Sequence, residues 1–260
     1  MKEAWPEQGG SNPFDSERAC AHSAYLSPQN TGALTERQET IQKEFAGWIQ
    51  EQQYPCVGAK AAINSGAYRM GIYEASMTDS GAMAGLARDL WEFVQEQPEM
   101  GSDFTTFAAC FTEAMPASES EFESQLWAVL QSLYDVDRLW DSADPKISTN
   151  PDAEDFGFSF AGRGFFVIGL HPEASRLARR FSCPTLVFNA HAQFDTLKAD
   201  GRYPKMQAAI RARDIALQGS INPMLANFGE RSEARQYAGR AVEEEWRCPF
   251  HRHHADTLEE

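Results

Sequence analysis

Two histidines stand directly after apolar runs, and their positions suit chemistry. His171 follows the run at residues 164–170, and His191 follows the run at residues 185–190. Both runs are rich in Phe, Val and Ile and are bounded by Gly or Pro, which is typical of buried strands. An imidazole where a strand meets a loop is held rigidly beside open space, so it could bind iron or another metal or act as a general base. A hydrogen-bonded structural histidine is the competing interpretation.

The segment between the two runs carries three arginines, Arg176, Arg179 and Arg180. Pro172 could begin a short helix here, because its missing N–H is not needed at the first helical position. Guanidinium groups pair with carboxylates and phosphates, so this segment predicts a site for an acidic group near His171. The alternative is that the arginine stems simply cover apolar surface.

Two cysteines also stand outside regular periodicity. Cys56 follows Pro55 after a predicted helix, and Cys248 lies within six residues of both Trp246 and His251. Either thiol could be a thiolate ligand or a redox group, although a buried free cysteine usually behaves as a small hydrophobic residue. The five cysteines form no C-x-x-C pair and no zinc spacing, so reduced thiols are expected.

Charge is unevenly distributed along the 260 residues, which carry a net charge of -15. Residues 1–159 contain 9 basic and 26 acidic side chains, whereas residues 160–250 contain 13 basic and 9 acidic ones. A strongly acidic protein repels phosphate backbones, so nucleic acid is not expected as a partner, and a small cationic substrate is favoured. No apolar run is long enough for a membrane helix, and the N-terminus lacks the apolar region of a signal peptide. We therefore expect a cytoplasmic protein.

The elements that position these residues are predicted by periodicity. A helix is expected from Thr35 to before Pro55, with Thr35 and Gln38 as its capping box. A second helix is expected from about Asp79 to Pro98. A third should begin at Ser120, where Ser120 and Glu123 would form a capping box. A further helix over residues 206–217 should stop at Gly219, and a turn is expected after His191. Strands are predicted near 68–76, 104–111 and 156–160, besides the two apolar runs.

These elements predict an α+β fold, in which a single mixed α/β domain has a central sheet of five or six strands flanked by helices. The sheet is expected to be largely antiparallel or mixed. Residues 1–33 are expected to be an irregular N-terminal arm, residues 34–251 the domain, and residues 252–260 a flexible tail.

Several motifs in one order resemble the YqcI/YcgG family, also called FPC/CPF-motif proteins. Cys248-Pro249-Phe250 matches the second motif, and Tyr54-Pro55-Cys56 matches the first except that Tyr replaces Phe. Residues 165–172 with Ser175, Arg176 and Arg179, then residues 184–194 and 213–223, are also similar to the family. The resemblance covers roughly residues 35–251.

The resemblance implies binding of heme b and hydroxylation of a guanidine nitrogen of arginine or an arginine-like small molecule, with dioxygen or peroxide as co-substrate. It implies an axial iron ligand, for which His171 is the first candidate, with Arg176, Arg179 and Arg180 on the propionates. His191 is the rival ligand and otherwise the distal acid/base. A thiolate of Cys56 or Cys248 is the third alternative.

A guanidinium substrate would be held by an aromatic wall and a carboxylate. The candidates are Trp246 and Phe250 for the wall, Asp195 and Asp214 for the carboxylate, and Arg213 or Arg240 for the carboxylate of the substrate itself. An electron-donor protein is a further expected partner. Two other functions remain open, which are heme binding or sensing without turnover and thiol redox chemistry by Cys56 and Cys248.

Overall fold

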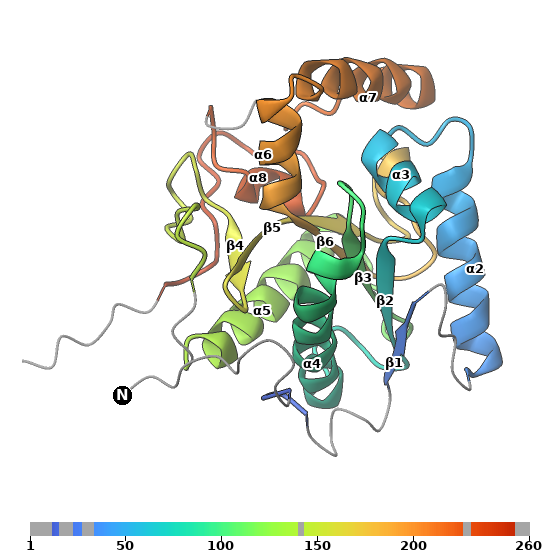
Figure 1. Cartoon of the computed structure of the whole chain (residues 1–260), viewed down its shortest axis with the longest axis vertical. Coiled ribbons are helices and arrows are strands. Elements are labelled where there is room, and N and C mark those ends of the chain that lie inside the picture. The colour runs from blue at the N-terminus through green and yellow to red at the C-terminus, as the bar shows by residue number, and fades with distance from the viewer. Residues whose placement is uncertain (1–11, 16–22, 28–33, 140–142, 226–229, 253–260) are drawn as a thin grey trace, which may run out of the picture.

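A six-stranded sheet forms the centre of the computed structural model, which describes residues 12–15, 23–27, 34–139, 143–225 and 230–252. The strand order is β1-β2-β3-β6-β5-β4 (Figure 1). Strands β2 and β3 are parallel, and the other neighbours are antiparallel. The strands are β1 (Ser23–Leu26), β2 (Tyr68–Tyr73), β3 (Thr106–Phe111), β4 (Phe158–Phe160), β5 (Arg163–Leu170) and β6 (Thr185–Ala190). The predicted α+β fold with a mixed sheet is confirmed.

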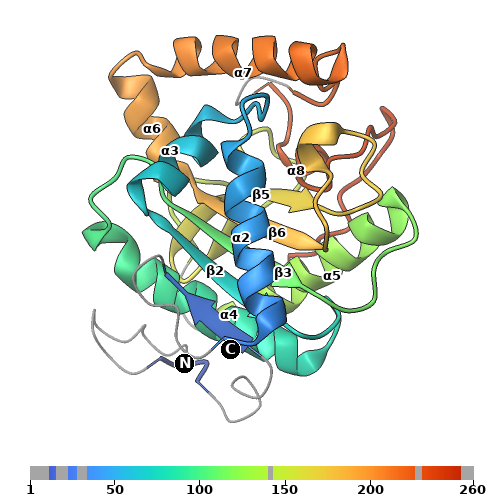
Figure 2. The same cartoon turned by 90° about the vertical axis from the view of Figure 1, so that its right-hand side faces the viewer.

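Helices cover both faces of the sheet. Helices α4 and α5 pack on one face and α2 lies across the other, beside α3, while α7 lies at one end of the molecule in both views (Figures 1 and 2). The helices are α2 (Glu36–Gln50), α3 (Val57–Ser65), α4 (Ser80–Glu96), α5 (Glu119–Asp137), α6 (His191–Ala199), α7 (Tyr203–Gln218) and α8 (Ala234–Tyr237), with short 3-10 turns η1 (Gln97–Glu99) and η2 (Leu177–Arg179).

Strand alternation divides the core between the two faces. Phe107, Phe165 and Phe188 point to the side of α4 and α5, where they join the larger hydrophobic cluster. Met70 and Ala108 point to the opposite side, where they pack with α2 in a second cluster. Successive side chains on a strand point to opposite faces of the sheet, so the even-numbered and odd-numbered residues of one strand pack in different hydrophobic clusters.

Five details of the predicted elements are wrong. Helix α5 is capped by Ser118, which accepts a hydrogen bond from Glu121 N, and not by Ser120. The segment after Pro172 forms only the 3-10 turn η2, and the residues after His191 form helix α6 in place of a turn. Strand β1 lies within the arm that was predicted to be irregular, and helix α3 was not predicted. The predicted tail, apart from Arg252, lies outside the described residues.

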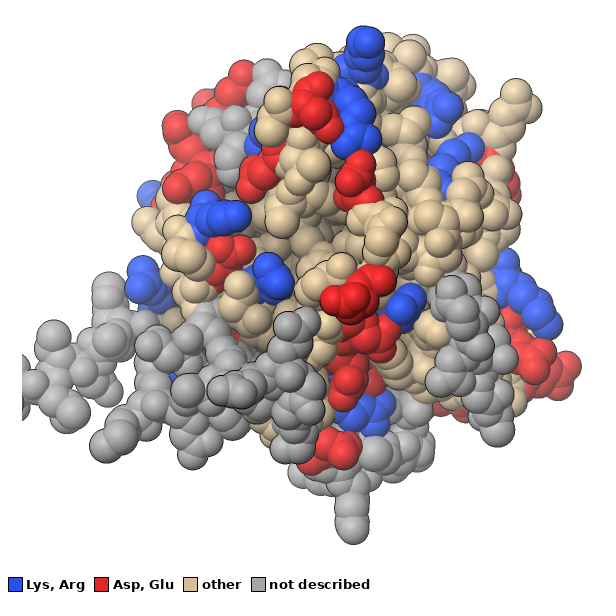
Figure 3. Space-filling view, in the orientation of Figure 1, with Lys and Arg blue, Asp and Glu red and all other residues tan. Residues whose placement is uncertain are grey.

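No helix in the described part of the chain is long and apolar enough to cross a membrane. On the face seen in Figure 3, acidic and basic side chains are interspersed, and no large patch of one sign covers the described residues there.

Thr35→Ala is expected to lower the free energy of unfolding by about 1 kcal/mol, because it removes the N-cap of α2. The Thr35 side chain accepts from Gln38 N, and the Gln38 side chain accepts from Thr35 N, so the predicted capping box is present. Urea unfolding followed by circular dichroism measures the change. Thr40→Ala is the matched control, since Thr40 donates only to the Glu36 carbonyl on the exposed side of the same helix. Equal effects of the two substitutions would contradict the capping role.

Candidate functional site

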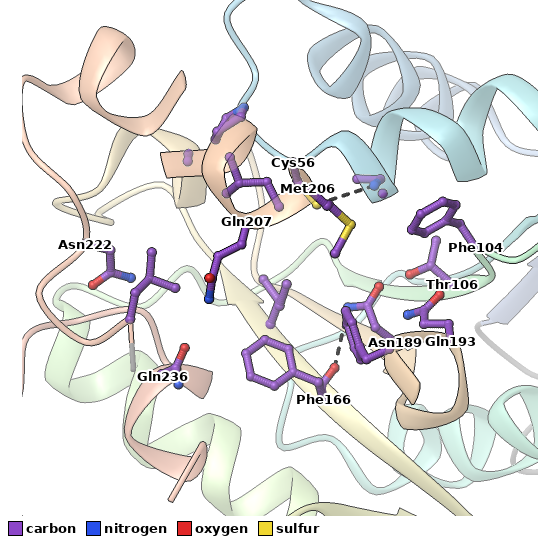
Figure 4. A pocket seen from close by; sticks show the side chains of 18 of the residues that line it. Cys56, Phe104, Thr106, Phe166, Asn189, Gln193, Met206, Gln207, Asn222 and Gln236 are labelled. Atoms are coloured by element: carbon purple, nitrogen blue, oxygen red, sulfur yellow. Dashed lines mark hydrogen bonds between the residues drawn. The ribbon is translucent and has the colours of Figure 1, made fainter. Parts of the chain in front are cut away.

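A cavity of about 260 Å³ lies between the sheet and the helices α3, α6 and α7. Its floor is the sheet face opposite α4 and α5, from which Thr106, Phe166 and Asn189 project (Figure 4). Ile168 lines the cavity as well. Helix α7 forms the wall facing the floor, and Asp214 is its only buried residue.

The cavity combines apolar walls with an excess of basic side chains. Phe104, Phe166, Met206 and Ile210 are among the apolar residues. The charged lining residues are five basic ones and two acidic ones, namely Arg176, Arg179, Lys198, Arg211, Arg231, Asp214 and Glu233. This balance is opposite to that of the whole chain, so the cavity suits a ligand that carries acidic groups.

His191 is held at the cavity wall by a buried carboxylate. Its Nε2 lies 2.9 Å from Glu233 Oε1, and Tyr237 Oη donates to the same oxygen at 2.5 Å. Tyr237 also accepts from Phe158 N, which fixes its position. Burial raises the pKa of Glu233, while the hydrogen bonds from His191 and Tyr237 oppose that rise. A histidine oriented by a carboxylate is the usual arrangement of both metal-ligating and acid/base imidazoles.

His171 does not line this cavity. It has the same strand parity as Phe165 and Val167, so it points to the α5 side, where its ring stacks on Phe122 with centroids 4.2 Å apart. It is completely buried, and neither ring nitrogen has a hydrogen-bond partner within the described residues. Burial lowers its pKa to about 4. A heme in the cavity could not reach this imidazole, so the expectation that His171 is the ligand does not fit the structure.

Antiparallel pairing also separates the two histidines. In the β5–β6 pair, Leu170 lies opposite Thr185 and Phe165 lies opposite Ala190. The downstream ends of the two strands are therefore at opposite ends of the pair, about 17 Å apart for five residues of strand. The expectation that the two imidazoles flank one iron is therefore wrong, because they lie at different ends and on different faces of the sheet.

The arginines after β5 are used by the protein itself. Arg176 donates to Asp214 Oδ2 at 2.6 Å and to Ser220, and Arg179 donates to the carbonyl oxygens of Gly169, Tyr237 and Gln236. Both line the cavity, but their guanidinium groups hold backbone segments together. Arg180 is exposed, donates to the Ala174 carbonyl and does not line the cavity. The expected role of these three residues on propionates is not supported by their contacts.

The two motif cysteines lie on different faces of the sheet. Cys56 lines the cavity at the N-cap of α3, where its Sγ accepts from Ala59 N at 3.4 Å. Burial raises the pKa of this thiol, so the neutral form is favoured. Cys248 packs against the larger cluster near α5, and burial raises its pKa to about 12. Both cysteines are free, and the structure does not bring them together as a redox pair.

The predicted substrate residues lie outside the cavity, with one exception. Asp214 lines it but is bound to Arg176 and to Asn222 N. Four of the others have contacts elsewhere. Trp246 and Phe250 pack around Trp127, Arg240 binds Glu123 at 2.6 Å, and exposed Asp195 lies near Lys198. Arg213 is not a lining residue either. The aromatic wall is formed instead by Phe104, Phe166 and Phe194.

Sequence reasoning missed Asn189, Gln193 and Glu233, all of which line the cavity. Asn189 could have been found, because it is a polar residue within an apolar strand. Glu233 gave no such signal, since it lies in a segment without periodicity. In the described part of the chain, no group of three His, Cys, Asp or Glu side chains forms a metal site.

His171→Leu is expected to reduce the sensitivity of the fold to acid. The folded-state pKa of about 4 lies below the ordinary value of 6.5, so the unfolded chain binds more protons between these values, and stability falls as pH decreases from about 6.5 to about 4. The leucine variant should lose less stability over this window. Urea unfolding at pH 7 and pH 5 measures both proteins, and an equal loss in the two would contradict the assignment.

At pH 7 the same substitution should be neutral or stabilising, since it removes two buried polar atoms that have no partner. A clear loss of stability at pH 7 would show that the imidazole has a partner that stabilises the fold.

Comparison with known proteins gives one match. The family model of the YqcI/YcgG family matches residues 45–251. The match includes Tyr54-Pro55-Cys56 and Cys248-Pro249-Phe250, and it extends over strands β2 to β6 and every helix from α3 to α8. No curated protein and no solved structure matches the chain.

Proposed function

The chain belongs to the YqcI/YcgG family, and on that premise we propose that it is a heme-dependent monooxygenase that N-hydroxylates the guanidine group of arginine or an arginine-like small molecule. The supporting observation is the His191–Glu233 pair, which presents an oriented imidazole at the wall of an apolar cavity. Dioxygen with an electron-donor protein, or peroxide, would be the co-substrate.

The chemistry of the lining residues fits heme. His191 would be the axial ligand, because one ring nitrogen is already held by a carboxylate, as is usual for metal-ligating histidines. Cys56 is the weaker candidate, because a thiolate is the ligating form and burial favours the neutral thiol. Lys198, Arg211 and Arg231 would pair with the propionates in place of Arg176 and Arg179.

The size of the cavity sets a condition on heme binding. Its volume of about 260 Å³ is slightly below the ~300–1,000 Å³ of typical ligand pockets. Lys198 and Arg231 on its rim are exposed, so the cavity is open to solvent on their side. A bound heme would have to extend into this open mouth, because the enclosed volume is smaller than that of a typical ligand pocket.

When bound, heme would supply the activation of dioxygen or peroxide for transfer of one oxygen atom. The residues of the chain would orient the iron ligand and exclude water. Glu233 and Tyr237 would hold the orientation and tautomer of His191. Phe104, Phe166 and Met206 would exclude water from the reacting groups.

The test begins with reconstitution of the purified full chain with hemin. A Soret band that shifts with carbon monoxide is expected, followed by a product of arginine or an arginine analogue that has gained one oxygen atom, detected by mass spectrometry. Absence of a Soret band after reconstitution would end the proposal.

A heme-binding or sensing protein without turnover is the second candidate function. It is favoured by one observation, which is that both acidic residues lining the cavity are already bound, Asp214 to Arg176 and Glu233 to His191. A cationic substrate would find no uncommitted carboxylate among them. A protein with this function would show the Soret band but would leave arginine and other guanidines unmodified.

A further inference from the structure

Three aromatic rings connect the carboxylate partner of His191 to the surface on the α5 side of the sheet. Tyr237 Oη lies 2.5 Å from the oxygen of Glu233 that also binds His191. The Tyr237 ring stacks on Trp127 with centroids 5.7 Å apart, and the centroids of Trp127 and Trp246 are 6.3 Å apart. Tyr237 and Trp127 are buried, whereas Trp246 is partly exposed. The series therefore begins beside the candidate iron ligand and ends at solvent.

Each ring in this series belongs to a residue type that can lose one electron. The phenol of tyrosine and the indole of tryptophan are oxidised far more readily than the ring of phenylalanine. Phe156 and Phe250, which pack against Tyr237 and Trp127, therefore provide apolar surroundings only. Close contact between neighbouring oxidisable rings allows an electron to pass from one to the next.

Tyr237 also has a base in place for the proton that it must release. An oxidised phenol is a strong acid, so a tyrosine loses an electron readily only where its hydroxyl proton has an acceptor. Glu233 is that acceptor, and burial raises its pKa, which favours uptake of the proton. Burial raises the pKa of Tyr237 as well, so the hydroxyl keeps its proton until the ring is oxidised.

A second tyrosine–tryptophan pair gives an internal comparison. Tyr54 lines the cavity, and its ring centroid is 4.7 Å from that of the partly exposed Trp48. Burial raises the pKa of Tyr54, and within the described residues no carboxylate accepts a hydrogen bond from its hydroxyl. Oxidation of Tyr54 is therefore disfavoured, although the two rings are closer together than those of Tyr237 and Trp127.

We infer that Tyr237, Trp127 and Trp246 carry oxidising equivalents from the cavity to the surface when no guanidine substrate is bound, and that a one-electron donor is oxidised at Trp246. This inference rests on the proposed function, which supplies the activation of peroxide. It adds a peroxidase activity toward donors that cannot enter the cavity. It also gives the series a protective role, since oxidising equivalents leave the cavity before they damage Met206, which lines it.

The electrons and protons of this activity balance. Peroxide takes up two electrons and two protons and becomes two molecules of water. For each electron, Tyr237 is oxidised and passes its hydroxyl proton to Glu233, and Trp127 then reduces Tyr237, which recovers that proton. Trp127 Nε1 has no hydrogen-bond partner within the described residues, so the oxidised indole keeps its proton. Trp246 reduces Trp127, and the donor reduces Trp246, so two donors each lose one electron and the two protons come from solvent.

Peroxide treatment of the full chain, reconstituted with hemin and free of substrate, tests the path through the position of the damage. Mass spectrometry of tryptic peptides should find oxygen added to Trp246 above the level in the heme-free chain treated in the same way. Tyr237→Phe should lose this excess, because it removes the first oxidisable group. Trp48→Phe is the control and should keep it, since Trp48 belongs to the other pair.

Reduced cytochrome c tests the activity at the surface, because a protein donor cannot enter a cavity of about 260 Å³. It is basic, so it is attracted to a chain with a net charge of -15. The reconstituted chain should oxidise it when peroxide is added. Trp246→Phe should lose this activity and gain sulfoxide at Met206, whereas Trp48→Phe should change neither. Both substitutions replace a partly exposed indole with a smaller ring.

Three results with heme bound would overturn the inference and leave the proposed function standing. These are equal oxidation of Trp246 with and without heme, an unchanged excess in Tyr237→Phe, and equal loss of cytochrome c oxidation in Trp246→Phe and Trp48→Phe. The comparison of the unmodified chain with and without heme stands even where a variant does not fold. Absence of the Soret band, which is measured separately, rejects the proposed function and this inference with it.

Discussion

His191→Ala is expected to abolish the Soret band of the reconstituted protein and any N-hydroxylation that depends on heme. The substitution removes the imidazole that Glu233 orients at the cavity wall. Glu233→Gln should have a smaller effect, a decrease of about 10–100-fold in heme affinity, because it weakens the group that orients the ligand and leaves the ligand itself in place. Absorption spectra during hemin titration measure both.

His171→Leu is the control for this experiment, since it removes an imidazole on the opposite side of the sheet. Its heme spectrum should be that of the unmodified chain. Loss of the Soret band in His171→Leu together with its retention in His191→Ala would reverse the assignment of the ligand. Circular dichroism of each variant separates loss of heme from loss of fold.

Arg176→Met is expected to destabilise the fold by about 3–5 kcal/mol, the largest effect on stability that we predict. Arg176 and Asp214 are both buried, and their atoms Nη2 and Oδ2 are 2.6 Å apart. This pair joins the turn after β5 to α7, the helix that covers the cavity. Removal of the guanidinium leaves a buried carboxylate with only the N–H of Asn222 as its remaining partner among those described. Urea unfolding of the single variant measures the effect.

The double variant Arg176→Met with Asp214→Asn should regain most of that stability, because no uncompensated charge remains and an amide oxygen can still accept from Asn222 N. The same pair also predicts a loss of ligand binding in Arg176→Met, since α7 supplies Tyr203, Met206 and Gln207 to the cavity. Additive effects of the two substitutions would show that the pair is not coupled.

Local features of this chain could be predicted because short-range rules decide them. The capping box of Thr35 and Gln38, the cap of α4 at Asp79 and the stop of α7 at Gly219 each depend on a few neighbouring residues. The family could be recognised in the same way, since its motifs are contiguous runs of sequence. The apolar runs that became β5 and β6 were likewise evident from composition.

The candidate site required the tertiary structure, because hydrogen bonding between strands decides which residues meet. The sequence shows that two strands each end in a histidine, but it does not state whether the strands run parallel or antiparallel. Antiparallel pairing of β5 with β6 places the two imidazoles at opposite ends, and the alternation of side chains turns His171 toward α5. His191 and Glu233 are 42 residues apart in the sequence, so patterns among neighbouring residues could not predict that they form a pair.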